Sequence, residues 1–106
     1  MLKNELRIGR ITSAIPSEGL RKPSFILEID LGPELGMRRS SAQLTERYCP
    51  EDLLDRFVVC VCDLEPKQIG PYLSEVLVLG AESAESGRGI TLLGPDSGVE
   101  PGAIVH

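Results

Sequence analysis

Histidine and aromatic residues are scarce in this sequence. The only histidine among the 106 residues is His106, and aromatic residues make up 4% of the chain. Without an internal histidine there is no Ser–His or Cys–His pair for nucleophilic catalysis, and no glycine-rich phosphate loop precedes a predicted helix. Proteins that bind any single-stranded nucleic acid usually stack bases on several aromatic rings. We therefore expect no enzyme, no catalytic residue, no cofactor and no generic single-strand binder.

A disulfide or metal site is not indicated either. The three cysteines, Cys49, Cys60 and Cys62, are an odd number, which fits a reducing compartment. Cys60 and Cys62 lie two apart in an apolar run, so their side chains would share one face of a strand with parallel directions, a poor geometry for a disulfide. Neither has a histidine nearby. We expect small buried side chains here rather than a metal or redox pair.

Long hydrophobic runs and an excess of positive charge are also absent. No apolar stretch approaches the roughly 18 residues of a membrane helix, and residues 1–5 meet charge at once without an apolar signal core. These features predict a cytoplasmic protein without membrane insertion. The net charge is −5, from 16 acidic and 11 basic residues. Proteins that depend on phosphate contacts are usually basic, so the balance disfavours nucleic-acid binding, although a local basic patch would suffice for it.

What the sequence does contain is the period of β-structure. Residues 25–31 alternate apolar and polar side chains, which predicts a half-buried strand. Residues 6–15 change phase beside Gly9, which predicts a bulge or bend there. The runs 57–62 and 76–79 are continuously or almost continuously apolar and predict strands covered on both faces.

One short helix is predicted between the third and fourth strands. Pro50 suits the first helical position, and Glu51 complements the positive end of the helix dipole. Three strands, one helix, two further strands and a β-rich tail follow the order of an OB-type barrel. Residues 1–106 are therefore expected to form one all-β domain, a closed five-stranded OB-type barrel with short terminal extensions.

Two segments carry residues that a barrel wall does not explain. Residues 37–44, on the predicted third strand, place charge and hydrogen-bond donors on both faces, beginning with Arg38 and Arg39. Residues 64–76 read as a loop with apolar residues between two prolines and a glycine. An edge strand protected by charge and a loop that caps the core would account for them. Ligand binding is the alternative for both.

Several strings of residues, in order and without insertion, carry a resemblance to a known family. The sequence resembles the CsaA-type export-related chaperones of the tRNA-binding-domain superfamily over almost its whole length. Superfamily members that bind tRNA typically carry Gly-Met after a Ser-Glu pair, where this sequence has Val76 and Leu77. The matching strings are Arg7–Ile11, Arg38–Thr45, Tyr48-x-Pro50-Glu51-Asp52-Leu53, Pro66-x-Gln68-Ile69-Gly70-Pro71, Ser74–Gly80 and Pro101–Ile104.

The resemblance implies a chaperone that holds unfolded or export-bound polypeptides without a nucleotide. The SecA translocation motor would be a second partner. The alternative is a tRNA-binding module like the domain appended to methionyl-tRNA synthetases, and an interaction domain without clients is a third reading. An OB barrel binds along its second and third strands and the flanking loops. We expect the groove between the third strand and the loop before the fifth, lined by Arg38, Arg39, Ser41, Gln43, Lys67, Gln68, Ile69, Tyr72 and Leu73.

A homodimer is also implied, joined through segments near both termini. Apolar residues near the two ends of the sequence have no obvious internal partners in a single barrel. An isologous interface would bury them, unless both tails simply close the barrel. The expected interface residues are Leu2, Leu6, Ile104 and Val105.

Overall fold

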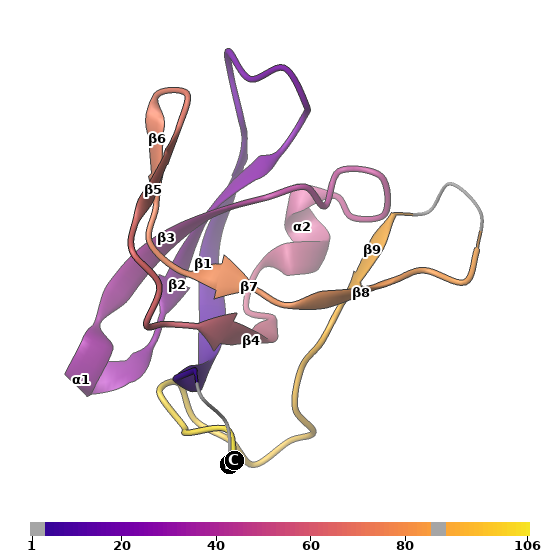
Figure 1. Ribbon diagram of the computed structural model, residues 1–106. Coiled ribbons are helices and arrows are strands. Elements are labelled where there is room, and N and C mark those ends of the chain that lie inside the picture. The colour runs from indigo at the N-terminus through magenta and orange to yellow at the C-terminus, as the bar shows by residue number, and fades with distance from the viewer. Residues whose placement is uncertain (1–3, 86–88) are drawn as a thin grey trace.

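The fold is seen in a computed structural model, which describes residues 4–85 and 89–106 (Figure 1). Strands dominate it, as the sequence predicted. In chain order the elements are β1 (Leu6–Pro16), β2 (Phe25–Asp30), α1 (Gly32–Leu35), β3 (Met37–Ala42), α2 (Pro50–Leu53), β4 (Phe57–Val61), β5 (Lys67–Ile69), β6 (Tyr72–Ser74), β7 (Leu77–Val78), β8 (Gly80–Glu82) and β9 (Ile90–Leu92). Neither helix is long and apolar enough to cross a membrane within these described ranges.

Five strands form one antiparallel sheet in the order β3-β2-β1-β4-β7. The sheet curls until β3 meets the segment that follows β6. There the Glu75 amide donates to the Arg39 carbonyl at 2.8 Å, and the Ser41 amide donates to the Ser74 hydroxyl oxygen at 3.1 Å. These bonds close the sheet almost completely. The five-stranded OB-type barrel predicted from the sequence is confirmed.

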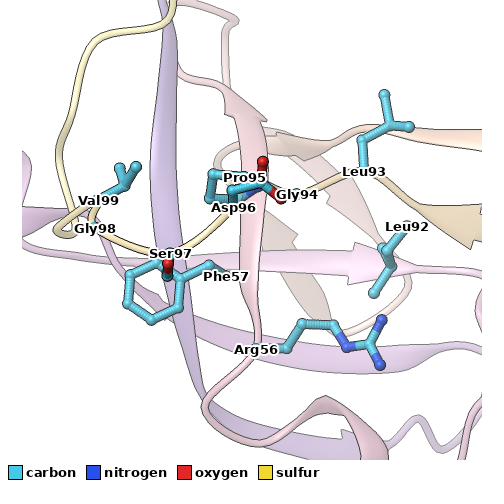
Figure 2. A pocket seen from close by; sticks show the side chains of 10 residues that line it. All are labelled: Arg56, Phe57, Leu92, Leu93, Gly94, Pro95, Asp96, Ser97, Gly98 and Val99. Atoms are coloured by element: carbon cyan, nitrogen blue, oxygen red, sulfur yellow. The ribbon is translucent and has the colours of Figure 1, made fainter.

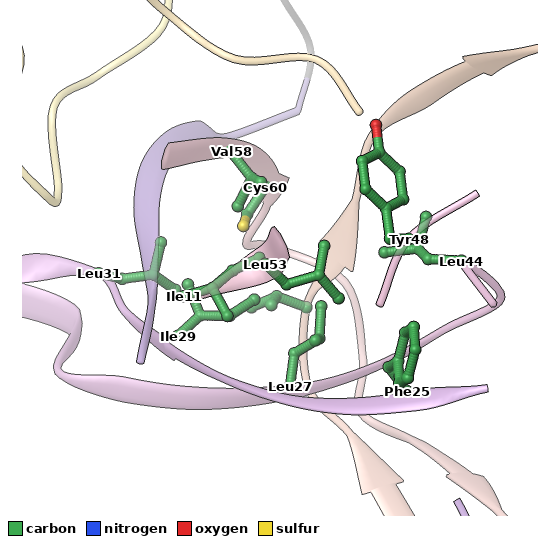
Figure 3. Packing of buried hydrophobic residues seen from close by; sticks show 11 residues of the cluster. Ile11, Phe25, Leu27, Ile29, Leu31, Leu44, Tyr48, Leu53, Val58 and Cys60 are labelled. Atoms are coloured by element: carbon green, nitrogen blue, oxygen red, sulfur yellow. The ribbon is translucent and has the colours of Figure 1, made fainter. Parts of the chain in front are cut away.

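The interior of the barrel is one apolar cluster (Figure 3). Alternation along β2 directs Phe25, Leu27 and Ile29 inward, and Leu27 and Ile29 have no exposed surface. The short helix α2 adds Leu53, which is also fully buried. The buried members of the cluster are Ile11, Phe25, Leu27, Ile29, Leu31, Leu44, Tyr48, Leu53, Val58, Cys60 and Val76.

The phase change in β1 lies further along the strand than the sequence indicated. Its register with β2 shifts between Ile11 and Ser13, so Thr12 is the extra residue, and the expected bulge beside Gly9 is wrong in position. Side chains on a strand alternate, so one extra residue exchanges the two faces beyond it. Ile11 consequently lies in the core, whereas Ile15 lies on the outer face and is 58% exposed.

Gly9 is needed for a different reason. A Cβ at this position would collide with the side chains of Ile29 and Leu31, which approach the backbone of β1 from β2 and its end. Gly9 therefore marks a close approach of two strands inside the core rather than a bulge.

The connections between strands differ from the expectations in two places. The predicted helix is α2, which begins at Pro50, but α1 adds a single unpredicted turn between β2 and β3. Residues 64–76, which read as a loop, contain the β5–β6 hairpin. The strand predicted over residues 76–79 is shorter in the structure, where β7 contains only Leu77 and Val78. Leu77 is 49% exposed, so the prediction that this strand is covered on both faces is wrong.

Residues 102–105 pair with the start of β1. The Gly102 amide donates to the Ile8 carbonyl at 2.7 Å, and the Ile8 amide donates to the Ala103 carbonyl at 2.9 Å. This tail therefore covers a strand edge of the barrel, which was the alternative to its use in a dimer. It nevertheless leaves Ile104 57% exposed.

The cysteines are free thiols. Cys60 is buried in the core as predicted, and burial raises the pKa of its thiol to about 12. Cys62 is half-buried, and burial also raises the pKa of its thiol. A thiol held in its protonated form is a poor nucleophile and a poor metal ligand, so Cys60 acts as a small apolar side chain.

Candidate functional site

The two arginines of β3 lie on opposite faces of the sheet. Arg39 pairs with Glu28, and both side chains are on the outer face, where the Arg39 guanidinium lies 3.9 Å from the Glu28 carboxylate. Arg38 pairs with Ile29, whose side chain is in the core. The structure therefore separates Arg38 from the groove in which the sequence placed both arginines.

A hollow of about 160 Å³, which we call the outer-face hollow, lies between β1, β2, β3 and the β5–β6 hairpin. Its floor is apolar and unusually exposed, since Ile15 is 58% accessible. The Arg39–Glu28 pair is also largely exposed, so it contributes only about 0–1 kcal/mol to stability. The lining residues are Ser13, Ile15, Pro16, Ile26, Glu28, Arg39 and Tyr72.

A second hollow of about 400 Å³, which we call the hairpin hollow, lies beside β5. Two exposed leucines line it, Leu64 at 43% and Leu77 at 49% exposure. Ile69 of this hollow lies opposite Tyr72 of the outer-face hollow in the hairpin, so neighbouring residues of one hairpin line the two hollows, which we call adjoining in this sense. The lining residues are Ser41, Leu64, Glu65, Lys67, Ile69, Ser74, Glu75, Val76 and Leu77.

The predicted site residues are thus only partly brought together. Gln68 and Leu73 lie opposite each other on the other face of the hairpin from Tyr72. Gln43 lines a third hollow of about 460 Å³ together with Lys22. The two adjoining hollows contain Arg39, Ser41, Lys67, Ile69 and Tyr72, and they do not contain Arg38, Gln43, Gln68 or Leu73.

Sequence reasoning missed the floor of the outer-face hollow, to which β1 and β2 contribute Ile15, Pro16 and Ile26. Ile15 was missed because a bulge beside Gly9 would have placed it on the core face. Ile26 did carry a signal: it is an apolar residue at an outward position of an otherwise alternating strand. An apolar side chain at an outward position is unfavourable in water unless another surface covers it.

Positive charge near the two hollows is limited. In the described part of the chain, Arg21, Lys22 and Lys67 have no carboxylate within 4 Å, and they lie in the β1–β2 loop and on β5. Carboxylates occupy the same region and balance this charge. They are Glu18, Glu28, Glu65 and Glu75.

A further hollow, of about 550 Å³, lies away from these residues (Figure 2). Arg56 and Phe57 at the start of β4 line it together with residues 92–99. The chain passes close to β4 there, since a Cβ on Gly94 would lie 2.5 Å from the Phe57 carbonyl oxygen. None of the site residues predicted from the sequence lines this hollow.

Comparisons with known proteins agree on one kind of domain. The model of a family described as a putative tRNA binding domain matches residues 6–104. The CsaA chaperone protein of Picrophilus torridus is 36% identical, with a TM-score of 0.90, and the alignment covers 98% of this chain and 92% of that one. The chaperone CsaA of Bacillus anthracis is 44% identical, with a TM-score of 0.87 and coverage of 97% and 91%.

An enzyme also contains a similar sequence. The methionine–tRNA ligase of Thiobacillus denitrificans is 39% identical over 107 residues, covering 97% of this chain. The chain spans only 15% of the length of that ligase. The likeness to the two chaperone structures therefore extends over nearly the full length of both partners, whereas the likeness to the ligase concerns a small part of it.

Proposed function

The chain belongs to the putative tRNA binding domain family as a CsaA-type member, and on this premise we propose that it is a chaperone that holds unfolded polypeptides. The observation that carries the proposal is the pair of adjoining hollows, whose floors leave Ile15, Leu64 and Leu77 between 43% and 58% exposed. Apolar surface gathered in concave sites favours binding of apolar side chains over exposure to water.

An extended polypeptide suits this site. Successive side chains of an extended chain point to opposite sides, so alternate residues of a client would face the barrel. Its apolar side chains would occupy the two hollows and supply most of the affinity. The exposed Arg39–Glu28 pair adds little, because solvent screens exposed charges. Binding of this kind depends weakly on client sequence and needs no nucleotide.

We further propose that the clients are polypeptides awaiting export from the cytoplasm, which the SecA motor would take over. The support for this part is the resemblance of the motifs to the export-related chaperones. The balanced charge around the hollows agrees with a polypeptide ligand rather than a phosphate backbone.

Binding of tRNA is the second candidate function. The family match favours it, and so do Lys67, which lines the hairpin hollow, and Arg21 and Lys22 in the β1–β2 loop, none of which has a carboxylate within 4 Å in the described ranges. The net charge of −5 and the carboxylates of the same region weigh against it, because each phosphate contact requires a cation that displaces counterions.

A side-by-side titration with tRNA and with a reduced, carboxymethylated polypeptide tests the proposal. We expect the unfolded polypeptide to bind, with little change in affinity between about 50 and 200 mM salt, because apolar contacts dominate. Binding to tRNA should be weaker and steeply salt-dependent. Submicromolar tRNA binding without polypeptide binding would make tRNA the ligand and reject the chaperone proposal.

We also propose that two copies of the chain associate. Leu6 lies on the outer face at the start of β1, and the Val105 amide donates to its carbonyl at 2.9 Å, which places the two half-buried side chains next to each other. Ile104 is 57% exposed and pairs with Arg7 on the opposite face of the same edge. A two-fold interface along this edge would cover Leu6, Val105 and Ile104. The fourth expected residue, Leu2, lies outside the described residues.

Light scattering on a size-exclusion peak measures the mass of the assembly directly. We expect a mass twice the 11.5 kDa of one chain at micromolar concentration. The double substitution Leu6→Glu and Ile104→Glu should halve the mass, because it buries four charges in the two-fold interface without partners. Leu54→Glu, at a 49% exposed leucine on another part of the barrel, is the control and should leave the dimer intact. A wild-type mass of one chain would rule the dimer out.

A further inference from the structure

Tyr72 lines the outer-face hollow and also ties two projecting segments together. Its side chain forms part of the wall of the hollow, and its hydroxyl oxygen accepts a hydrogen bond from the Glu18 amide at 2.9 Å. Glu18 belongs to the β1–β2 loop, whereas Tyr72 follows the turn of the β5–β6 hairpin. One residue thus connects the proposed binding site to a loop of a different hairpin.

A second contact joins the same two segments. Gly70, in the hairpin turn, has a φ of +56°, and a Cβ built on it would lie 2.5 Å from Leu20 Cδ2. The Leu20 side chain therefore packs directly on the turn. Figure 1 shows the β1–β2 loop and the β5–β6 hairpin projecting from the barrel in the same direction. We call the contacts Glu18–Tyr72 and Leu20–Gly70 the clasp.

We propose that the clasp gates the outer-face hollow, and that the structure shows its closed state. The inference rests on the proposed function, since it concerns entry of a client to that same site. With the clasp closed the hollow measures about 160 Å³, roughly half of the smallest volumes typical of ligand sites, about 300 Å³. A polypeptide segment therefore needs a wider site than this one. Movement of Tyr72 away from the β1–β2 loop provides it.

The clasp is weak enough to open. One neutral hydrogen bond at an exposed amide changes an equilibrium only about 2- to 12-fold. The loop itself is tied at its base, where the Ser17 amide donates to the Ser24 carbonyl at 2.8 Å and the Ser24 amide donates to the Ser17 hydroxyl oxygen at 3.1 Å. It can therefore separate from the hairpin without unravelling.

Two substitutions loosen the clasp without removing a side chain from the hollow. Tyr72→Phe keeps the ring and removes the hydroxyl group, and Leu20→Ala removes the packing on Gly70 at a residue that does not line the hollow. If only the open state admits a client, apparent affinity scales with the open fraction. We expect both variants to bind fluorescent, reduced and carboxymethylated α-lactalbumin faster, Tyr72→Phe by about 2- to 12-fold. Leu20→Ala, which changes no residue that lines the hollow, should keep the wild-type dissociation rate.

Amide hydrogen exchange in the protein without client tests the clasp separately. Leu20→Ala, which keeps the Tyr72 hydroxyl as acceptor, should raise the exchange rate of the Glu18 amide, because the fraction of open clasp rises. Tyr48→Phe is the matched control, since the Tyr48 hydroxyl also accepts a backbone amide, that of Leu92 at 3.0 Å, but lies outside the hollow. It should change neither the Glu18 exchange nor the association rate.

The outcomes separate the clasp from the function. Unchanged Glu18 exchange in Leu20→Ala, or association that is not faster in both clasp variants, overturns the gate. Slower association and faster dissociation in Tyr72→Phe alone would make the hydroxyl a client contact, which also overturns it. Complete lack of binding by the wild-type protein would instead refute the proposed function, while the exchange rates would still decide whether the clasp opens.

Discussion

The double substitution Ile15→Ser and Ile26→Ser is expected to weaken binding of an unfolded polypeptide about 10- to 100-fold. Both side chains line the outer-face hollow, and Ile15 is 58% exposed until a client covers it. Covering apolar surface contributes about 25 cal/mol per Å², so each isoleucine should account for about 1 kcal/mol or more of binding free energy. Fluorescence anisotropy with a labelled, reduced polypeptide measures the loss.

The matched control replaces two other exposed apolar residues, Met37→Ser and Leu54→Ser. Both are 49% exposed and neither lines the outer-face hollow or the hairpin hollow. The control should bind with wild-type affinity, and both double variants should unfold at a similar temperature because exposed positions contribute little to stability. Equal loss of binding in the two variants would show that exposed apolar surface in general, rather than this hollow, holds the client.

Leu27→Ala should lower the free energy of unfolding by about 2–5 kcal/mol. Leu27 has no exposed surface and lies in the middle of β2, among the other members of the barrel core. Alanine loses the transfer free energy of the deleted atoms and leaves a cavity, because a closed barrel cannot easily collapse around it. Domains of this size are stable by only about 5–15 kcal/mol, so the loss should be visible in a urea titration as a large shift of the midpoint.

Leu54→Ala provides the comparison for this stability measurement. Leu54 ends the short helix α2 and is 49% exposed, so its truncation should cost well under 1 kcal/mol. Equal losses of unfolding free energy in Leu27→Ala and Leu54→Ala would contradict the assignment of Leu27 to the core.

The fold was predictable because its strongest local signals agree with its tertiary structure. Strict alternation in residues 27–30 specifies which side of β2 is inside, and Pro50 marks the start of α2. The hairpin β5–β6 was not predictable as strands, because each is three residues long and the turn between them is Gly70-Pro71. Such short strands contain less than two periods of alternation, and they form through contacts with β3 that the sequence does not display.

The site was predictable only where a residue type was anomalous. Arg39 and Tyr72 stand out on a barrel wall and in an apolar loop, and both line the outer-face hollow. Arg38 stands out equally, but neighbouring residues of a strand point to opposite faces. Only the pairing of Arg38 with the core residue Ile29 shows that Arg38 lies on the other face from Arg39. Ile15 was missed for the same kind of reason, since a bulge three residues away from its expected position reverses the face of everything beyond it.

The pairing of residues 102–105 with β1 has a consequence for synthesis of the protein. The edge of β1 at Ile8 is covered by Gly102 and Ala103, more than ninety residues later in the sequence. Contacts between residues so distant in the chain form late and slow the folding of β-proteins. During translation this strand edge stays uncovered until residues 102–105 have been made, and an uncovered edge is a template for pairing with other nascent chains. The proposed chaperone is therefore itself prone to intermolecular strand pairing while it is being made.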